Sequence, residues 1–343
     1  MKKTFYVACP AYLVTGGTEL LHQLVFKLNN ILKERAYIFY INVDWKFEVP
    51  LTPKRFEKYV GNNWKTEIED TDSSVLIVPE ICPYLLFEQK NAFKVLWWLS
   101  VDNFYVQFST TKEELEERTF KNYIKKVLNR FPFRGFYTVL YDKRIDLHLC
   151  QSEYANLFLE KMKIYNRMSL SDYINTDVVI QPNSSLISKR KNQVLYNPYK
   201  GFSITKELIQ LANGKIEWIP LEKLDAIQIG TLMRESKIYI DFGNHPGKDR
   251  IPREAVLNDC IIITNRKGGA KNDLDIPIPE KYKFENPLYS SQKIIELIFE
   301  IFDTYENRIG DFVNYKSKIM NEEVVFENDL KNLVTFLYGN EEV

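Results

Sequence analysis

The chain has 343 residues, of which 45% are hydrophobic and 27% charged, which is enough for two domains that each bury a core. Lysine and arginine total 46, as do aspartate and glutamate, so the net charge is zero and no overall field favours nucleic acid as a partner. The four cysteines are widely spaced and lack the spacing of a metal site, so we expect reduced thiols in a cytoplasmic protein. No run approaches the ~18 apolar residues of a membrane span, so we expect none.

The first predicted elements are a strand, a loop, a helix and a second strand. Residues 4–9 and 37–43 have the β-branched and aromatic composition of buried strands, and residues 19–34 repeat apolar side chains at helical spacing. Gly16 and Gly17 fall in the loop before the helix, which in a Rossmann-like unit faces the ligand. The stretch lacks G-x-G-x-x-G, so it carries no NAD fingerprint.

Two more buried strands, at residues 74–78 and 94–99, are expected on either side of a helix at residues 82–92. Asp102 follows the second of these strands at its carboxyl end, where ligands bind in a parallel α/β sheet. A carboxylate there can take a proton from a hydroxyl group, so Asp102 is a candidate general base. An Asx turn or a helix cap explains an aspartate at this position equally well.

Residues 112–134 are predicted to be helical and become basic towards the end. From Lys121 to Arg134 there are five cations, three aromatic side chains and no acid. Such a surface suits an anionic acceptor or the face of a bilayer, although a solvated helix face has the same composition. His148, inside a predicted strand at residues 145–151, is better explained as a core histidine than as a catalytic one.

A polar and basic segment, Ser184–Asn192, is predicted to be a hinge between two domains. We expect an N-terminal domain at residues 1–185 and a C-terminal domain at residues 186–315. A terminal helix is expected at residues 316–343.

The most informative stretch is residues 236–270, predicted to be strand, loop, helix, strand and loop. Residues 237–242 and 260–264 are the strands, and Pro252 suits the first turn of the helix between them. Glycine loops at the carboxyl ends of two parallel strands place backbone N–H groups and a helix N-terminus around one crevice, where phosphate binds. The two loops contain His245, Gly247, Gly268 and Gly269.

Cations are expected around this crevice. Arg250 and Arg253 lie at the start of the predicted helix, where the macrodipole disfavours them unless an anion is bound. Lys200 follows a predicted strand at residues 194–196, and parallel topology would bring it to the same edge. Glu254 could accept hydrogen bonds from sugar hydroxyls. The sequence therefore predicts a diphosphate site, with an ordinary Rossmann-like unit and surface loop as the alternative.

Together these motifs resemble the nucleotide-sugar site of GT-B glycosyltransferases, in particular the family-four-like enzymes of bacterial capsule and O-antigen synthesis. The matching pairs are Lys200-Gly201, Glu254-Ala255 and Gly268-Gly269. The retaining family also has a first Glu, separated from the second by seven residues, and Pro246 stands in its place here. The resemblance implies an α/β GT-B fold, with two Rossmann-like parallel-sheet domains facing a central cleft and a terminal helix packed back on the first.

The resemblance also implies an activity: transfer of a sugar from a nucleoside-diphosphate sugar to a hydroxyl of a glycan or lipid-linked acceptor, in the cytoplasm or at the inner face of the membrane. The expected catalytic residues are Lys200 and Arg253, whose cations would stabilise the departing diphosphate, together with the candidate base Asp102. The implied donor contacts are Gly16, Gly17, Lys200, His245, Gly247, Arg250, Arg253, Glu254, Gly268 and Gly269.

No metal and no cofactor besides the donor substrate are expected. The Asp273-Leu274-Asp275 triplet matches the metal-binding DxD of another glycosyltransferase fold, but it follows the Gly-Gly turn and is interpreted as a loop. Two alternatives stay open: a non-catalytic nucleotide-sugar-binding or scaffold subunit, and a GT-B sugar-nucleotide epimerase. Replacement of the first Glu by Pro246 favours the non-catalytic alternative.

Overall fold

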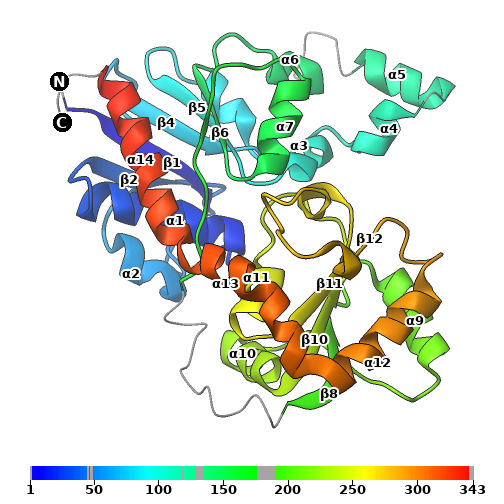
Figure 1. The fold of residues 1–343 in the computed structure, drawn as a ribbon. Helices are drawn as coiled ribbons and strands as arrows, with labels where there is room; N and C mark the ends of the chain where they lie inside the picture. Colours follow the sequence, from blue (N-terminus) through cyan, green and yellow to red (C-terminus); the bar gives the residue numbers. More distant parts are fainter. Residues whose placement is uncertain are drawn as a thin grey trace. The chain divides into compact units, whose positions relative to one another are not determined.

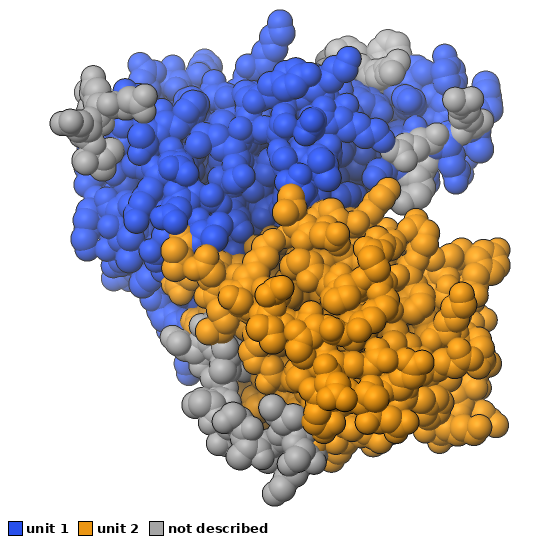
Figure 2. Space-filling model, in the orientation of Figure 1, with its two compact units in different colours: residues 1–172, 325–343 blue, residues 173–324 orange. Residues whose placement is uncertain are grey.

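A computed structural model describes residues 2–44, 46, 49–117, 119–128, 135–175 and 190–339. The chain divides into two compact units (Figure 2), and each unit is built on its own parallel sheet (Figure 1). The predicted pair of Rossmann-like parallel-sheet domains is thereby confirmed. Unit 1 comprises residues 1–172 and 325–343, and unit 2 comprises residues 173–324.

Unit 1 contains a seven-stranded sheet in the order β3-β2-β1-β4-β5-β6-β7, with every neighbouring pair parallel. Its strands are β1 (Thr4–Pro10), β2 (Arg35–Ile41), β3 (Trp64–Lys65), β4 (Ser74–Pro79), β5 (Phe93–Trp98), β6 (Leu147–Cys150) and β7 (Arg167–Ser169). Its helices are α1 (Gly16–Asn30), α2 (Glu57–Val60), α3 (Val101–Gln107), α4 (Lys112–Glu116), α5 (Phe120–Leu128), α6 (Phe136–Leu140), α7 (Glu153–Lys161) and most of α14 (Glu322–Tyr338).

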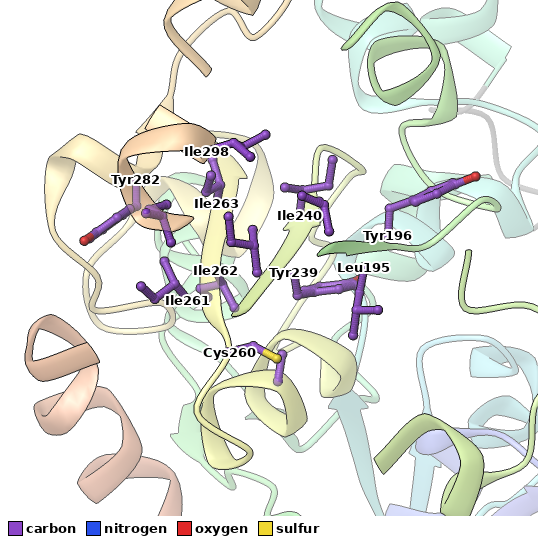
Figure 3. Packing of buried hydrophobic residues seen from close by; sticks show 14 of the residues in the cluster. Leu195, Tyr196, Tyr239, Ile240, Cys260, Ile261, Ile262, Ile263, Tyr282 and Ile298 are labelled. Atoms are coloured by element: carbon purple, nitrogen blue, oxygen red, sulfur yellow. The ribbon is translucent and has the colours of Figure 1, made fainter. Parts of the chain in front are cut away.

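Unit 2 contains a five-stranded sheet in the order β12-β11-β10-β8-β9, again all parallel. The isoleucine-rich strands at its centre are buried on both faces, and Figure 3 shows Leu195, Tyr239, Ile240 and Ile262 within this core. Its strands are β8 (Lys191–Tyr196), β9 (Glu217–Pro220), β10 (Ser236–Asp241), β11 (Ile261–Asn265) and β12 (Lys283–Phe284). Its helices are α9 (Phe202–Ala212), α10 (Ala226–Glu235), α11 (Arg250–Leu257), α12 (Ser291–Arg308) and α13 (Val313–Met320).

The first helix begins earlier than predicted, so Gly16 and Gly17 form its first turn and do not lie in a loop. The cause is a capping box. The Thr15 side chain accepts a hydrogen bond from the Thr18 backbone N–H, and the Thr18 hydroxyl pairs with the Thr15 backbone N–H.

The α-helix predicted at residues 82–92 is wrong, because only a short 3₁₀ helix forms there, η2 (Pro83–Phe87). The Asp70 carboxylate accepts the backbone N–H groups of residues 90–92, which an α-helix would have bonded internally. The long helix predicted at residues 112–134 is divided into α4 and α5, and residues 118 and 129–134 lie outside the described part of the chain.

Most of the predicted hinge, Ser184–Asn192, and the boundary at residues 185 and 186 also lie outside the described residues, while Lys191 and Asn192 already belong to β8. The chain passes from unit 2 back to unit 1 inside α14, between Val324 and Val325. All four cysteines are buried free thiols, as predicted. None of the helices in the described part of the chain is both long and apolar enough to cross a membrane.

Candidate functional site

Two loops at the carboxyl edge of the unit 2 sheet are packed together through glycines. Gly201, after β8, has a φ of +63°, and a Cβ atom there would lie 2.4 Å from the carbonyl carbon of Phe242. Gly243, after β10, would place a Cβ atom 2.6 Å from the Cβ of Lys200. Only glycine allows the loops after β8 and β10 to come this close, and their contact determines the position of Lys200.

A third loop, after β11, is packed on the same β10 loop. Gly268 has a φ of +55°, and a Cβ atom there would come within 1.9 Å of the His245 carbonyl oxygen. The Gly269 N–H donates to that carbonyl oxygen at 2.7 Å, and a Cβ atom on Gly269 would meet the Gly247 oxygen at the same distance. The Gly-Gly turn therefore binds the protein's own loop, and the Gly269 amide already has an acceptor.

Side chains from the end of β10 and from the loops after β8 and β10 form a charged cluster. Lys200 Nζ is 3.0 Å from Asp249 Oδ2, and His245 Nδ1 is 3.1 Å from the same oxygen atom. His245 Nε2 lies 3.9 Å from Asp241 Oδ1. The His245 side chain is fully buried, yet neither ring nitrogen makes a well-directed hydrogen bond. Asp249 is the nearer of the two carboxylates to the ring.

These contacts shift the pKa values of the buried groups. Burial alone would lower the pKa of His245, but the Asp249 and Asp241 carboxylates outweigh it and raise that pKa above its usual value. Burial alone would raise the pKa of Asp249, but the His245 and Lys200 side chains outweigh it and lower that pKa. The His245 ring therefore holds its proton more tightly than a free histidine, and Asp249 holds its proton less tightly than a free aspartate.

Among the described residues, Asp241, His245 and Asp249 form the one group of acidic and histidine side chains whose ligand atoms, all within 4.8 Å of one another, could hold a metal ion. The Asp241 oxygens already accept from the Tyr239 hydroxyl and the Gly243 N–H, each at 3.0 Å. The second carboxylate of the group, Asp249, accepts a hydrogen bond from the Lys200 amine. A metal ion would have to displace these donors. Asp273 lies in a turn and pairs with Lys283 Nζ at 2.7 Å, as expected of a loop residue.

Lys200, Arg250 and Arg253, the cations expected around the crevice, each have a carboxylate partner. Arg250 pairs with Glu254 one turn along α11. Arg253 Nη1 donates to Glu322 Oε2 at 2.6 Å. Together with the Lys200 pair described above, these contacts relieve the repulsion that three bare cations would suffer.

The Arg253 side chain is buried and supports the backbone of the β10–α11 loop. Its side chain is 2% exposed, and it donates to the backbone oxygens of Lys248 at 2.9 Å and Asp249 at 3.2 Å. Lys248 Nζ binds the other oxygen of the same Glu322 carboxylate at 2.9 Å. The β10–α11 loop is therefore tied to the first residue of α14, a connection that the sequence does not reveal.

The remaining predicted residues, Gly16, Gly17 and Asp102, belong to unit 1. Asp102 lies in the first turn of α3, and its Oδ1 accepts from the Tyr154 hydroxyl at 3.1 Å. The helix cap is Ser100, whose side chain accepts the Asn103 N–H, so Asp102 is not the cap. Unit 2 thus brings together Lys200, His245, Gly247, Arg250, Arg253, Glu254, Gly268 and Gly269.

Sequence reasoning missed Glu80, which directly follows β4. Its side chain is buried, and burial raises its pKa to about 7 despite hydrogen bonds that include one from the Leu99 N–H at 3.0 Å. Through the hydrogen bond from the Leu99 N–H, Glu80 holds the backbone just before α3, the helix in which Asp102 lies. The available signal was an acid immediately after an apolar strand, the same signal that singled out Asp102.

No protein-family model matches the sequence, and no curated protein matches it either. The solved structures do. Sucrose-phosphate synthase from Thermosynechococcus elongatus is 12% identical, with a TM-score of 0.65 over 99% of this chain and 100% of that one. A glycosyltransferase from Rickettsia africae is 14% identical, with a TM-score of 0.58 over 99% and 100%. Anabaena HepE in complex with UDP-glucose is 11% identical, with a TM-score of 0.57 over 97% and 99%. The chain has the GT-B fold of these glycosyltransferases.

Proposed function

We propose that this protein transfers a sugar from a nucleoside-diphosphate sugar to a hydroxyl group. The observation that carries the proposal is the set of three glycine-packed loops at the carboxyl edge of the unit 2 sheet, which hold Lys200, His245 and the start of α11 together. A lysine, a buried histidine and a helix N-terminus are groups that bind a diphosphate. The GT-B fold is consistent with a nucleotide-sugar substrate.

In the proposed donor complex, the diphosphate takes the place of the Asp249 carboxylate at Lys200. Bond cleavage leaves negative charge on the departing diphosphate, and the Lys200 ammonium and the α11 N–H groups stabilise it. Arg250 is the second candidate cation, on release from Glu254, whose carboxylate then accepts hydrogen bonds from the ribose. This set of charges needs no metal ion.

Other residues have supporting roles in the proposal. Arg253 acts by holding the β10–α11 loop, and Gly247, Gly268 and Gly269 allow that loop its shape. In unit 1, Asp102 takes the proton from the acceptor hydroxyl as it attacks the sugar carbon. Gly16 leaves the start of α1 open, since a Cβ atom there would meet nothing within 4 Å, whereas one on Gly17 would lie 3.7 Å from the Leu99 side chain.

The acceptor in the proposal is a glycan or a lipid-linked sugar, and the pathway is synthesis of bacterial surface polysaccharide on the cytoplasmic side of the membrane. The support is the resemblance of Lys200-Gly201, Glu254-Ala255 and Gly268-Gly269 to the donor motifs of such enzymes. A non-catalytic nucleotide-sugar-binding subunit and an epimerase are the competing functions. Pro246, in place of the first Glu of the motif, favours the non-catalytic one.

Calorimetric titration with UDP, GDP, ADP and dTDP tests the donor site, and product analysis with a labelled donor tests the reaction. Transfer of the label to an acceptor in the presence of a chelator supports a metal-independent transferase. Conversion of the donor to an isomer indicates the epimerase, and binding without turnover indicates the scaffold. If none of the four diphosphates binds, the proposed function is wrong.

Asp102→Asn tests the proposed base. Loss of the base should lower turnover by about 10²-fold or more while donor affinity stays close to wild type. A variant that turns over as fast as wild type would show that Asp102 is not the base and that its role is structural, as in its hydrogen bond from the Tyr154 hydroxyl.

A further inference from the structure

Helix α5 is amphipathic but packs with its polar face inward. Successive helical residues turn by roughly 100°, so Phe120, Tyr123, Ile124 and Leu128 lie on one apolar stripe. These four side chains are 80%, 64%, 43% and 64% exposed. A surface helix normally buries this stripe against the core. Here it faces outward, which is uncommon for a protein surrounded only by water.

Polar contacts hold the helix in this orientation. Asn122, on the opposite face, is buried, and its Nδ2 donates to Glu117 Oε2 at 3.1 Å. Lys125 Nζ lies 2.7 Å from Glu114 Oε2 in α4. The inward face of α5 therefore consists of paired polar groups, and the outward apolar stripe follows from these contacts.

Two lysines border the stripe. On the helical wheel Lys121 lies next to Leu128, and Lys126 lies next to Tyr123 on the opposite border. Neither lysine makes an ion pair with another described residue, in contrast to Lys125. Cations along both borders of an exposed apolar stripe are the pattern of a helix that lies in a membrane interface.

A hollow adjoins the stripe on the Tyr123 side. It has a volume of about 620 Å³, and its walls include the aromatic side chains of Phe120, Tyr123 and Tyr137 and the side chains of Lys126 and Lys161. The walls also include Glu117, so two lysines stand against one carboxylate. Aromatic walls with this excess of positive charge suit a ligand that is partly apolar and partly anionic. A phospholipid at a bilayer surface has both properties.

We propose that α5 docks on a bilayer that contains anionic lipids. The four apolar side chains enter the boundary between headgroups and acyl chains, and Lys121 and Lys126 contact the lipid phosphates. A second copy of the chain fits the stripe less well, because two copies face to face would bring the same lysines together. Docking goes beyond the proposed function and would bring the enzyme to a lipid-linked acceptor. Since α5 is short, we expect weak, reversible attachment.

Sedimentation of the full chain with vesicles tests the proposal. We expect binding to vesicles of phosphatidylcholine mixed with phosphatidylglycerol, weaker binding to phosphatidylcholine alone, and a decrease with added salt. Reversing both lysine charges, in Lys121→Glu with Lys126→Glu, should lower the vesicle affinity by about ten-fold or more. Phe120→Ser with Leu128→Ser should lower it similarly. The controls are Lys206→Glu with Lys293→Glu, and Tyr289→Ser, which change exposed side chains in unit 2.

The proposal is overturned if the wild-type protein binds neither kind of vesicle, or if the α5 variants bind as well as wild type. It is also overturned if the α5 variants only convert a dimer into a monomer, measured by light scattering, because a second copy would then cover the stripe. Nucleoside-diphosphate affinity, measured on the same variants, should stay at the wild-type value and shows that they are folded. If the wild-type protein itself binds no nucleoside diphosphate, that result contradicts the proposed function and not the docking of α5.

Discussion

At the scale of single residues, the donor proposal depends on competition for Lys200. The Asp249 carboxylate now binds the Lys200 amine and the His245 ring directly before α11, where a phosphate would be favoured. Lys200→Ala should therefore weaken binding of the best nucleoside diphosphate by roughly 1.5–3 kcal/mol, the usual range for a charged hydrogen bond. Asp249→Asn removes the competing charge and should tighten binding by about three- to ten-fold.

Calorimetric titration measures both effects, with Lys206→Ala on the exposed side of α9 as the matched lysine control. Weaker binding in Asp249→Asn would show that the carboxylate positions Lys200 and does not compete with the ligand. Wild-type affinity in Lys200→Ala would move the diphosphate site elsewhere. Stability should change little in Lys200→Ala, because its side chain is 39% exposed and such ion pairs contribute about 0–1 kcal/mol.

Arg253 should behave in the opposite way. Its guanidinium is buried, and Arg253→Ala would take one of two cation partners from the Glu322 carboxylate and remove a donor from the carbonyl oxygens of Lys248 and Asp249. Breaking one side of a buried ion pair typically costs about 3–5 kcal/mol, so the variant should unfold at clearly lower denaturant concentration. Chemical denaturation beside Lys200→Ala measures the difference. Equal stability of the two variants would show that the Arg253–Glu322 contact is not maintained in solution.

At the scale of elements, the glycine contacts between the β10 and β11 loops should be required for folding of unit 2. Gly268→Ala would place a methyl group 1.9 Å from a backbone oxygen at a φ of +55°, so the loops would have to separate. We expect a loss of several kcal/mol, at the upper end of what single substitutions do. Gly16→Ala and Gly310→Ala are the controls, since their new methyl groups would meet nothing within 4 Å.

Thermal unfolding measures these effects, and a Gly268→Ala variant as stable as Gly310→Ala would show that the loops can separate at little cost. Gly16→Ala also tests unit 1. A methyl group in the first turn of α1 should leave stability equal or slightly higher. A loss of donor affinity in that variant would then support the proposed contact between Gly16 and the donor.

The sequence predicted the longer strands well, because buried parallel strands such as Ile261–Asn265 are continuous apolar runs. It did not predict the short strands β3 and β7, and it placed Gly16 and Gly17 in a loop. It could not predict how side chains far apart in the chain pair with one another. Asp70 prevents the helix expected at residues 82–92, and Glu322 accepts both Lys248 and Arg253 across about seventy residues of chain. The reason for Gly268 was also missed. The pattern indicated a close approach to a ligand, whereas the structure places the His245 carbonyl there.

At the scale of the whole molecule, the two units should respond oppositely to acid. In unit 1, burial lowers the pKa of His22 and of His148 to about 4, so the unfolded chain takes up protons first as the pH falls below about 6.5. At pH 5, about 1.5 units below that value, each histidine costs roughly 2 kcal/mol of stability. Glu80 acts in the other direction, because its raised pKa of about 7 means that the folded state takes up a proton first. The stability lost through His22 and His148 together is larger than the stability gained through Glu80. Unit 1 should therefore lose stability between pH 8 and pH 5.

In unit 2, acid should have the opposite effect on stability. The pKa of His245 is raised, so the folded state binds its proton more tightly than the unfolded chain does. The stabilisation is complete below pH 6.5 and is lost as the pH rises through the folded pKa. Acidification from pH 8 to pH 5 should therefore leave unit 2 as stable or more stable, while unit 1 weakens. The Asp249 carboxylate does not change this, because its pKa is lowered and it stays ionised at pH 5.

Scanning calorimetry at pH 8 and pH 5 measures the divergence, and hydrogen exchange followed by mass spectrometry assigns each transition. Peptides from β4 and β5 report on unit 1, and peptides from β10 and β11 report on unit 2. We expect the unit 1 peptides to exchange faster at pH 5, after correction for the intrinsic exchange rate, and the unit 2 peptides to stay protected. His148→Gln should reduce the acid sensitivity of unit 1, and His245→Asn should remove the protection of unit 2 by acid. If both units weaken together at pH 5, the buried histidines do not control the pH response, because a shared cause would have to act on both sheets.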